Sequence, residues 1–169
     1  MFVLGVDPGL SRCGYGAVEA TAKGPQARAV GVLRTETTAD LPVRLHDLQK
    51  ELRALIAELR PDVVAVERIF FQHNVRTAMS VGQASGLAMA EAVAAGCEVV
   101  QYSPNEVKLA VAGDGAADKV QVQVMVQRLL RLARPPRPAD AADAAALALC
   151  HLAHAPARGR LAAAVRSAR

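Results

Sequence analysis

Four carboxylates stand where predicted strands end or a predicted helix begins. Asp7 follows the apolar run Phe2–Val6, and Glu67 follows the apolar run Val63–Val66. Asp140 and Asp143 are three residues apart at the start of a predicted helix, so their side chains share one helix face. Functional groups collect at the carboxyl ends of parallel strands. We therefore expect Asp7 and Glu67 at one edge of a sheet, with the helix start beside them.

Four convergent carboxylates predict a divalent metal site. Two like charges ~4 Å apart repel by roughly 4 kcal/mol at an effective dielectric constant of about 20, and a cation removes that cost. An all-carboxylate set favours Mg²⁺ or Mn²⁺ over zinc, and two such ions can activate a water and hold the leaving oxygen of a phosphodiester. Each acid alone also has a structural interpretation, as a turn former or a helix-start residue. The prediction therefore depends on the four together.

Aromatic and basic residues near the same edge predict contacts with nucleic acid. Phe70 and Phe71 are two of the three phenylalanines in the chain. Stacking of an unpaired base on such a ring contributes ~1–3 kcal/mol, although one of the two rings is expected in the core. Arg76, Lys108 and Lys119 are predicted in loops or helix starts at this edge, where they would contact phosphates or stabilise transition-state charge.

Apolar periodicity predicts an α/β fold with a mixed sheet covered by helices on both faces. Leucines recur every three or four residues between positions 41 and 60, which is one helix face, and Pro61 ends it. Ser103-Pro104-Asn105-Glu106 has the capping-box pattern of a helix start. The predicted strands are Phe2–Val6, 13–20, 28–36, Val63–Val66 and Cys97–Tyr102, and the predicted helices are 41–60, 75–95, 104–111, 118–133 and 139–154. His151 and His154 share a helix face but have no third ligand in view, which favours a structural role.

Length and composition indicate one globular domain, expected over residues 1–155, followed by a basic and mobile tail over 156–169. The 169 residues are 52% hydrophobic and 21% charged, which excludes disordered and collagen-like classes. No run approaches the roughly 18 apolar residues of a membrane span, and the three cysteines are scattered, so we expect a cytoplasmic protein with no membrane contact. The net charge of +4 only permits an anionic partner. Its distribution is more informative, because Asp140 and Asp143 are the only acids among eight arginines from Arg128 onward.

These motifs together resemble the RuvC family of bacterial Holliday junction resolvases over residues 1–152. Four features carry the resemblance: the segment Gly5–Gly16, Glu67 followed by Phe70, the segment Val111–Val122, and the segment Ala139–Ala144. The resemblance implies a ribonuclease-H-like fold, with a five-stranded mixed sheet flanked by helices, in a symmetric homodimer. Some family members carry a histidine at one of the last two acid positions, whereas this chain has aspartate at both.

The resemblance also implies a metal-dependent endonuclease that resolves four-way DNA junctions in recombination and repair. Each subunit would nick one of two like-polarity strands, leaving a 5′-phosphate and a 3′-hydroxyl, with RuvA and RuvB as partners. Matched by position, the metal-binding catalytic acids are Asp7, Glu67, Asp140 and Asp143, with two Mg²⁺ or Mn²⁺ ions per subunit. Phe70 matches the ring that engages unpaired bases, and Lys108 and Lys119 match basic residues near the scissile phosphate. Of these two lysines, Lys119 is also expected to be catalytic.

Three other kinds of protein share part of this pattern. A YqgF-like nuclease of the same fold acting on RNA shares the opening motif, but Phe70 and the Asp140/Asp143 pair argue against it. A junction-binding module without cleavage would have lost acids, and all four are present. A phosphate-binding lobe of a sugar-kinase-like ATPase needs a second lobe, for which 169 residues leave no room.

Overall fold

The computed structural model describes residues 1–68 and 75–167, without the side chains of residues 75–77 and 156–167. It confirms the predicted order of strands and helices. The strands are β1 (Phe2–Asp7), β2 (Arg12–Thr21), β3 (Gly24–Arg34), β4 (Val63–Glu67) and β5 (Glu98–Tyr102), and the helices are α1 (Leu41–Leu59), α2 (Val75–Ala94), α3 (Pro104–Ala112), α4 (Lys119–Leu129) and α5 (Ala139–Ser167).

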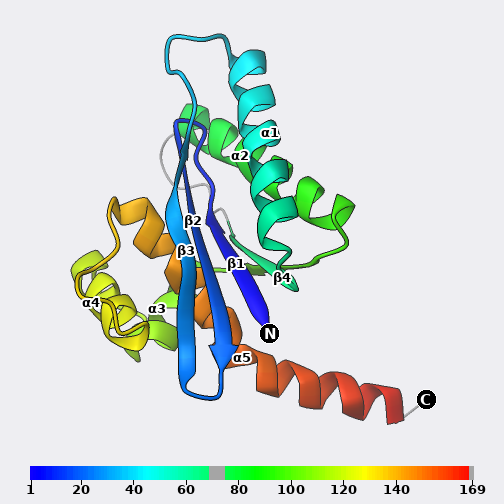
Figure 1. Ribbon diagram of the computed structural model, residues 1–169, viewed down its shortest axis with the longest axis vertical. Helices are drawn as coiled ribbons and strands as arrows, with labels where there is room; N and C mark the ends of the chain where they lie inside the picture. Colours follow the sequence, from blue (N-terminus) through cyan, green and yellow to red (C-terminus); the bar gives the residue numbers. More distant parts are fainter. Residues whose placement is uncertain (69–74, 168–169) are drawn as a thin grey trace.

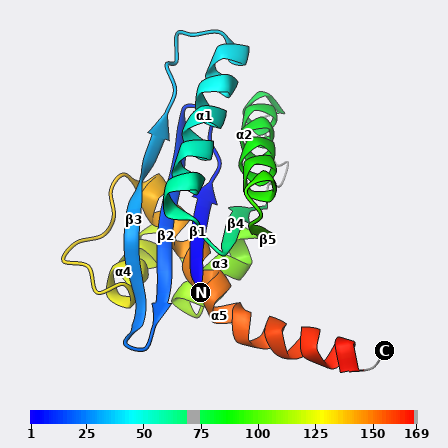
Figure 2. The same ribbon diagram turned by 45° about the vertical axis from the view of Figure 1, so that its right-hand side comes forward.

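The five strands form one mixed sheet in the order β3-β2-β1-β4-β5. The hairpin β2–β3 and the pair β1–β2 are antiparallel, whereas β1, β4 and β5 are parallel. Helices α1 and α2 cover one face, while α5, with α3 and α4 packed against it, covers the other (Figures 1 and 2). This is the layered arrangement that the sequence predicts.

Strand periodicity decides which face each carboxylate at the sheet edge points toward. Successive side chains of a strand point to opposite faces. In β1 and β4 the even-numbered residues Leu4, Val6, Val64 and Val66 lie in the core under α1 and α2, and the odd-numbered residues Val3, Val63 and Ala65 lie in the core under α5. By the same alternation, Asp7 and Glu67 belong to the α5 side of the sheet.

Local sequence signals explain two helix starts near the site. Ser103 caps α3 through the predicted box, because its hydroxyl accepts from the Glu106 N–H while the Glu106 carboxylate accepts from the Ser103 N–H. Asp118 and Gln121 form an equivalent box at the start of α4. These caps fix the positions of Lys108 and Lys119, which lie on α3 and α4.

Two helix ends differ from the prediction. α4 ends at Leu129 rather than near residue 133, and Arg131 then adopts a positive φ of 53°. α5 was expected to end near His154, but its backbone remains helical to Ser167 and extends away from the rest of the molecule (Figures 1 and 2). Pro156 has no N–H to bond to the Leu152 carbonyl and its ring crowds that carbonyl, but the surrounding alanines, leucine and arginines favour a helix.

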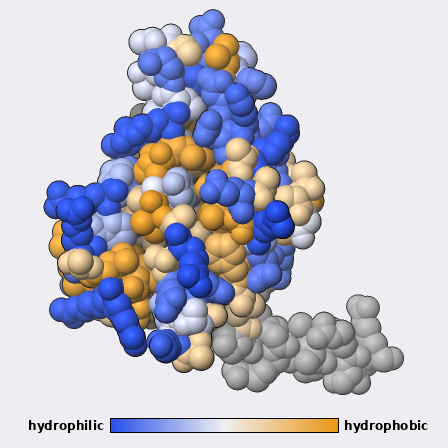
Figure 3. Space-filling model, viewed as in Figure 1, coloured by the Kyte–Doolittle hydropathy of each residue, from blue (hydrophilic) through white to orange (hydrophobic). Residues whose placement is uncertain are grey.

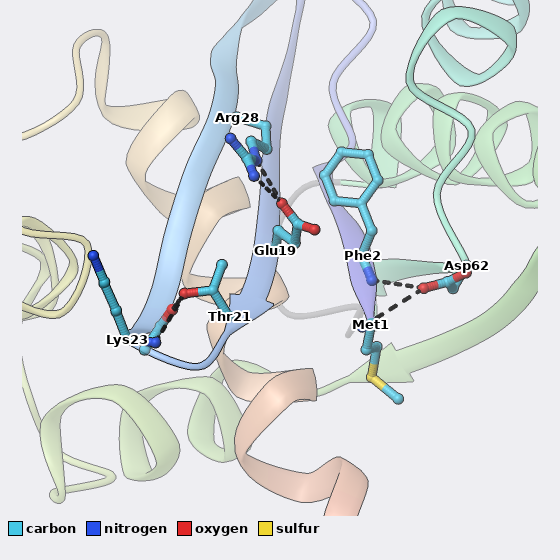
Figure 4. A network of polar contacts seen from close by, with 8 residues as sticks. Met1, Phe2, Glu19, Thr21, Lys23, Arg28 and Asp62 are labelled. Carbon is cyan, nitrogen blue, oxygen red and sulfur yellow. Dashed lines mark hydrogen bonds and ion pairs between the residues drawn. The ribbon is translucent and has the colours of Figure 1, made fainter.

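The opposite end of the sheet is held by polar contacts. The Phe2 N–H donates to Asp62 Oδ2 at 2.7 Å, which ties the start of β1 to the residue before β4 (Figure 4). Arg28 of β3 is paired with Glu19 of β2 in the same region.

On the face shown in Figure 3, hydrophilic side chains cover the upper end and apolar ones gather toward the middle. Within the described part of the chain, no helix has the length and apolarity that a membrane span requires.

Candidate active site

Asp7 and Glu67 lie side by side at the carboxyl edge of the sheet. Each is the last residue of its strand, and the parallel register pairs the preceding residues, Val6 and Val66. Two acids on neighbouring parallel strands, pointing to the same face, are therefore brought together by the sheet alone. This confirms the predicted position of both residues.

Close packing of α5 on the sheet brings the second pair of acids to that edge. A Cβ on Gly14 of β2 would lie 2.1 Å from the Asp140 carbonyl oxygen, and one on Gly5 of β1 would lie 1.9 Å from the Ala144 carbonyl oxygen. Only glycine permits such an approach of helix backbone to strand backbone. Asp140 and Asp143, in the first turns of α5, are consequently held next to the ends of β1 and β4.

An open pocket lies between these acids and helices α3 and α4. Its floor is apolar, and its charged groups are carboxylates from the sheet and α5 together with lysines from α3 and α4. The residues that line it are Asp7, Glu67, Pro104, Val107, Lys108, Lys119, Val122, Asp143, Ala146 and Leu147. Asp140 does not line the pocket, but it is close enough to act on the charge of Asp7.

The site carries more negative charge than its own cations neutralise. Burial raises the pKa of Asp7 to about 7, and the neighbouring charges of Glu67, Asp143 and Asp140 add to this effect. Burial, followed by the charge of Asp143, also raises the pKa of Glu67. Carboxylates with raised pKa values in a pocket are typical of functional sites.

Two cationic side chains each contact one acid of α5. Lys119 Nζ donates to Asp143 Oδ2 at 3.2 Å, and Arg12 Nε lies 3.4 Å from Asp140 Oδ2. The charge of Asp143 and this hydrogen bond raise the pKa of Lys119, so the ammonium stays charged. The sequence prediction included Lys119 but missed Arg12.

The donor set fits a hard divalent cation in its chemistry, because four carboxylates converge on one edge of the sheet, where burial and then the charges of the other three raise the pKa of Asp7. The side-chain positions, however, are those of ion-paired acids. Within residues 1–68 and 75–167, no three His, Cys, Asp or Glu side chains are grouped closely enough to hold one ion. Binding would therefore require the carboxylates to rotate, and Asp143 and Asp140 to exchange Lys119 and Arg12 for metal.

The predicted DNA contacts are placed in part. Lys108 lies in the middle of α3 rather than in a loop or at a helix start, because Pro104 begins that helix four residues earlier, yet its side chain lines the pocket. Lys119 is the first residue of α4. Arg76 is the second residue of α2, and its side chain lies outside the description, as do both Phe70 and Phe71.

A polar network that the sequence prediction missed anchors the loop after Asp7. Arg44 of α1 donates from Nη2 to Ser11 Oγ at 2.7 Å and from Nε to Thr35 Oγ1 at 3.1 Å. The buried Thr35 hydroxyl in turn donates to the Leu10 carbonyl at 2.6 Å. The loop therefore has a defined path between Asp7 and Arg12. No local motif reveals this network, because it joins residues 25 and 33 positions apart.

The two histidines of α5 make structural contacts. His151 is buried, and its Nδ1 lies 2.9 Å from the Tyr102 hydroxyl. The His154 ring stacks on Tyr102 and its Nδ1 hydrogen-bonds to the Cys150 carbonyl at 2.8 Å. These contacts agree with the structural interpretation of both residues.

Comparison with known proteins identifies the family. Residues 3–151 match the family model described as RuvC, crossover junction endodeoxyribonuclease. The chain is 56% identical over 170 aligned residues to the crossover junction endodeoxyribonuclease RuvC of Salinispora arenicola, with 100% of this chain and 97% of that protein covered. The protein of the same description from Streptomyces avermitilis is 55% identical, with 98% of this chain and 94% of that protein covered.

Solved structures agree with the sequence match. The structure of Thermus thermophilus RuvC has a TM-score of 0.85 at 35% identity, covering 92% of this chain and 96% of that chain. The same protein in complex with a Holliday junction substrate has a TM-score of 0.86 at 36% identity, covering 92% and 94%. The predicted ribonuclease-H-like architecture is thereby confirmed. The chain carries its candidate site at the carboxyl edge of this sheet, and it matches its relatives over nearly its whole length. It therefore belongs to the RuvC family of crossover junction endodeoxyribonucleases.

Proposed function

We propose that this protein is a structure-selective endonuclease that resolves four-way DNA junctions during recombination and repair. The observation that carries the proposal is the convergence of four carboxylates, from β1, β4 and α5, beside a pocket with two lysines. The relatives that match almost the full chain are crossover junction endodeoxyribonucleases, and one of them is solved with a Holliday junction. No comparison supports an RNA-directed or non-cleaving alternative.

The reaction depends on metal, as it does in the RuvC family. We propose two Mg²⁺ or Mn²⁺ ions per subunit, held by Asp7, Glu67, Asp140 and Asp143. When bound, divalent cations neutralise these acids, polarise an attacking water and stabilise charge on the phosphate. The raised pKa of Asp7 supports the proposal, because burial and then the charges of the neighbouring acids favour the protonated form, and a cation at this position would offset both effects.

The remaining charged residues of the pocket bind the substrate. Lys119 and Lys108 would contact the scissile phosphate or its neighbours and stabilise the charge that develops there. In the proposed hydrolysis, a water oxygen bonds to phosphorus and the bond from phosphorus to the 3′ oxygen breaks. The 3′ oxygen gains a proton, leaving a 3′-hydroxyl and a 5′-phosphate that a ligase can rejoin.

Residues close to the branch point of the junction would engage unpaired bases and flanking phosphates. By its match to the family motif, Phe70 is proposed to stack on a base. Phe71 beside it is proposed to contact DNA because of its type and place in the sequence, and Arg76 to bind phosphate on the same grounds. Their position in the sequence supports this assignment, because Phe70 and Phe71 come shortly after Glu67, the last residue of β4, and Arg76 is the second residue of α2.

Paired nicks require two sites related by a two-fold axis, which a homodimer supplies. The surface of α2 supports this, because Met79 and Val93 expose 60% and 65% of their areas and lie fourteen residues apart, nearly four whole turns, on one side of the helix. A second copy of the chain would cover these apolar side chains. RuvA and RuvB are the proposed partners. The proposed location is the cytoplasm, where such a DNA substrate occurs.

A comparison of substrates tests the proposed function. Wild-type protein is incubated with Mg²⁺ or Mn²⁺ and a four-way junction, a linear duplex of the same sequence or an RNA–DNA hybrid. We expect paired, symmetric nicks in the junction alone, with products that DNA ligase reseals. Preferential cutting of the hybrid would instead identify an RNA-directed nuclease, and junction binding without cutting would identify a binding module.

A further inference from the structure

Arg12 forms an ion pair with an active-site acid at the rim of the site. Its Nε lies 3.4 Å from Asp140 Oδ2, with 56% of the Arg12 side chain and 24% of the Asp140 side chain exposed. An exposed pair of this kind contributes only about 0.2–1 kcal/mol to stability. A stabilising role is therefore a weak reason for an arginine at this position.

A second arginine stands directly opposite Arg12 on the neighbouring strand. The antiparallel register pairs Arg12 of β2 with Arg34 of β3, and paired residues project from the same face. That face is the α5 side, because Gly14, two residues along β2, lies against Asp140. Arg34 is exposed, and none of the ion pairs among the described residues includes it.

Two arginines directly opposite each other are unfavourable for the sheet itself, because like charges in cross-strand pairs repel. The same arrangement is favourable beside a polyanion. A guanidinium binds phosphate through two parallel N–H groups, and each phosphate contact releases counterions from DNA. The two arginines come from β2 and β3, whereas Lys108 and Lys119 come from α3 and α4, so they extend the basic surface beyond the pocket.

We propose that Arg12 and Arg34 form a second phosphate-binding edge of the active site, and that Arg12 exchanges Asp140 for a DNA phosphate when Asp140 becomes a metal ligand. This inference rests on the proposed function, since it takes the substrate to be DNA and the acids to hold a divalent cation. The ion pair keeps Asp140 neutralised before the substrate arrives. The exchange delivers the arginine to the DNA strand beside the acids.

The salt dependence of junction binding tests the phosphate contacts. Arg12→Gln and Arg34→Gln are compared with Arg28→Gln, which removes the same charge from the same hairpin but lies six residues from Arg34, roughly 20 Å along the strand, and is paired with Glu19 (Figure 4). Binding is followed by fluorescence anisotropy in Ca²⁺, with a denaturing gel to verify that the junction is intact.

We expect Arg12→Gln and Arg34→Gln each to lower the slope of log K against log salt by about 1, and Arg28→Gln to leave it unchanged. Arg12→Lys should restore most of the slope. If the slopes of Arg12→Gln and Arg34→Gln match that of Arg28→Gln, the phosphate-binding edge is refuted.

Metal binding by the DNA-free protein tests the exchange. Calorimetric titration with Mn²⁺ should show affinity roughly two- to fivefold higher in Arg12→Gln than in wild type, since Asp140 no longer gives up an ion pair, and a smaller gain in Arg34→Gln. Equal affinities for the two variants would overturn the exchange. Failure of wild type to prefer a four-way junction over linear duplex would refute the proposed function instead, and that comparison uses no variant.

Discussion

Asp7 is the residue at which the fold and the chemistry of the site meet. Its strand position places it beside Glu67, while the docking of α5 surrounds it with two further acids. Burial and these charges raise its pKa to about 7, far above the ordinary value of an aspartate. Without metal, the folded chain therefore binds a proton that the unfolded chain would release.

The proton on Asp7 makes stability depend on pH. Between pH 4 and 7 the folded state holds more protons than the unfolded state, so the free energy of unfolding falls as pH rises through this range. Asp7→Asn removes this loss. In EDTA it should be more stable than wild type by up to roughly 4 kcal/mol at pH 8, since a tenfold change in proton affinity corresponds to about 1.4 kcal/mol.

Urea unfolding at pH 5, 6, 7 and 8 measures this difference. The advantage of Asp7→Asn over wild type should grow with pH up to about 7 and then level off. Asp47→Asn, on α1, serves as the control and should follow wild type. An advantage of the same size at pH 5 and pH 8 would contradict the raised pKa.

Phe70 is a second single residue whose substitution tests the proposed function, although it lies outside the described residues. Phe70→Ala should lower the cleavage rate of a junction more than its binding affinity, because loss of a stacked base costs ~1–3 kcal/mol where the strand must be distorted for cutting. Phe71→Ala provides the comparison. Equal losses of cleavage and binding in Phe70→Ala, with loss of thermal stability, would assign this ring to the core.

At the scale of elements, the active site depends on how closely α5 packs on β1 and β2. The helix and the strands can approach closely because α5 is rich in alanine and the facing strand positions are glycines, so no large side chain separates their backbones. The motif Gly5–Gly16 that carries the family resemblance therefore has a packing role in addition to the catalytic role proposed for Asp7. It supplies Asp7 and also the surface on which Asp140 and Asp143 are positioned.

Gly14→Ala tests this packing. The added Cβ would meet the Asp140 carbonyl oxygen at 2.1 Å, a backbone atom, so α5 must shift. We expect a loss of about 1–3 kcal/mol in the free energy of unfolding and a weaker affinity for Mn²⁺. Gly115→Ala, in the loop before α4, is the control, because its Cβ meets only the Asn105 carbonyl oxygen, at 4.0 Å, and it should leave the free energy of unfolding close to that of wild type. Equal stability of Gly14→Ala and wild type would show that α5 does not depend on this glycine.

The sequence predicts those features of the site that follow from local patterns. Apolar runs ending in Asp7 and Glu67, the Ser103 capping box and the spacing of Asp140 and Asp143 each depend on a few neighbouring residues. Contacts between distant segments are not predictable in this way. Arg12 meets Asp140 only because α5 crosses β2, and Arg44 reaches Ser11 only because α1 lies beside the loop. Pro156 predicts a helix end, because a proline removes one helical hydrogen bond, but the helix-favouring residues around it carry α5 past this position.

At the scale of the whole molecule, the charge distribution acquires a function. Asp140 and Asp143 are the only acids in the arginine-rich last quarter of the sequence, and the fold sets them against Asp7 and Glu67 rather than leaving them on a basic surface. Basic residues of several elements surround these acids, a distribution suited to drawing in a polyanion while cations screen the carboxylates. A dimer would present two such sites to one junction.

We propose that the carboxylate cluster catalyses junction cleavage and is not needed for junction binding. Asp7→Asn preserves the shape of the side chain while removing its charge, and Asp47→Asn controls for the same change elsewhere. The decisive measurement is the single-turnover cleavage rate of a four-way junction in Mg²⁺ or Mn²⁺, taken alongside the junction affinity of the same preparations. We predict that Asp7→Asn cuts about a thousandfold or more slowly, equivalent to about 4 kcal/mol of transition-state stabilisation, with affinity close to that of wild type. Cleavage by Asp7→Asn at the wild-type rate would contradict the assignment of the metal site.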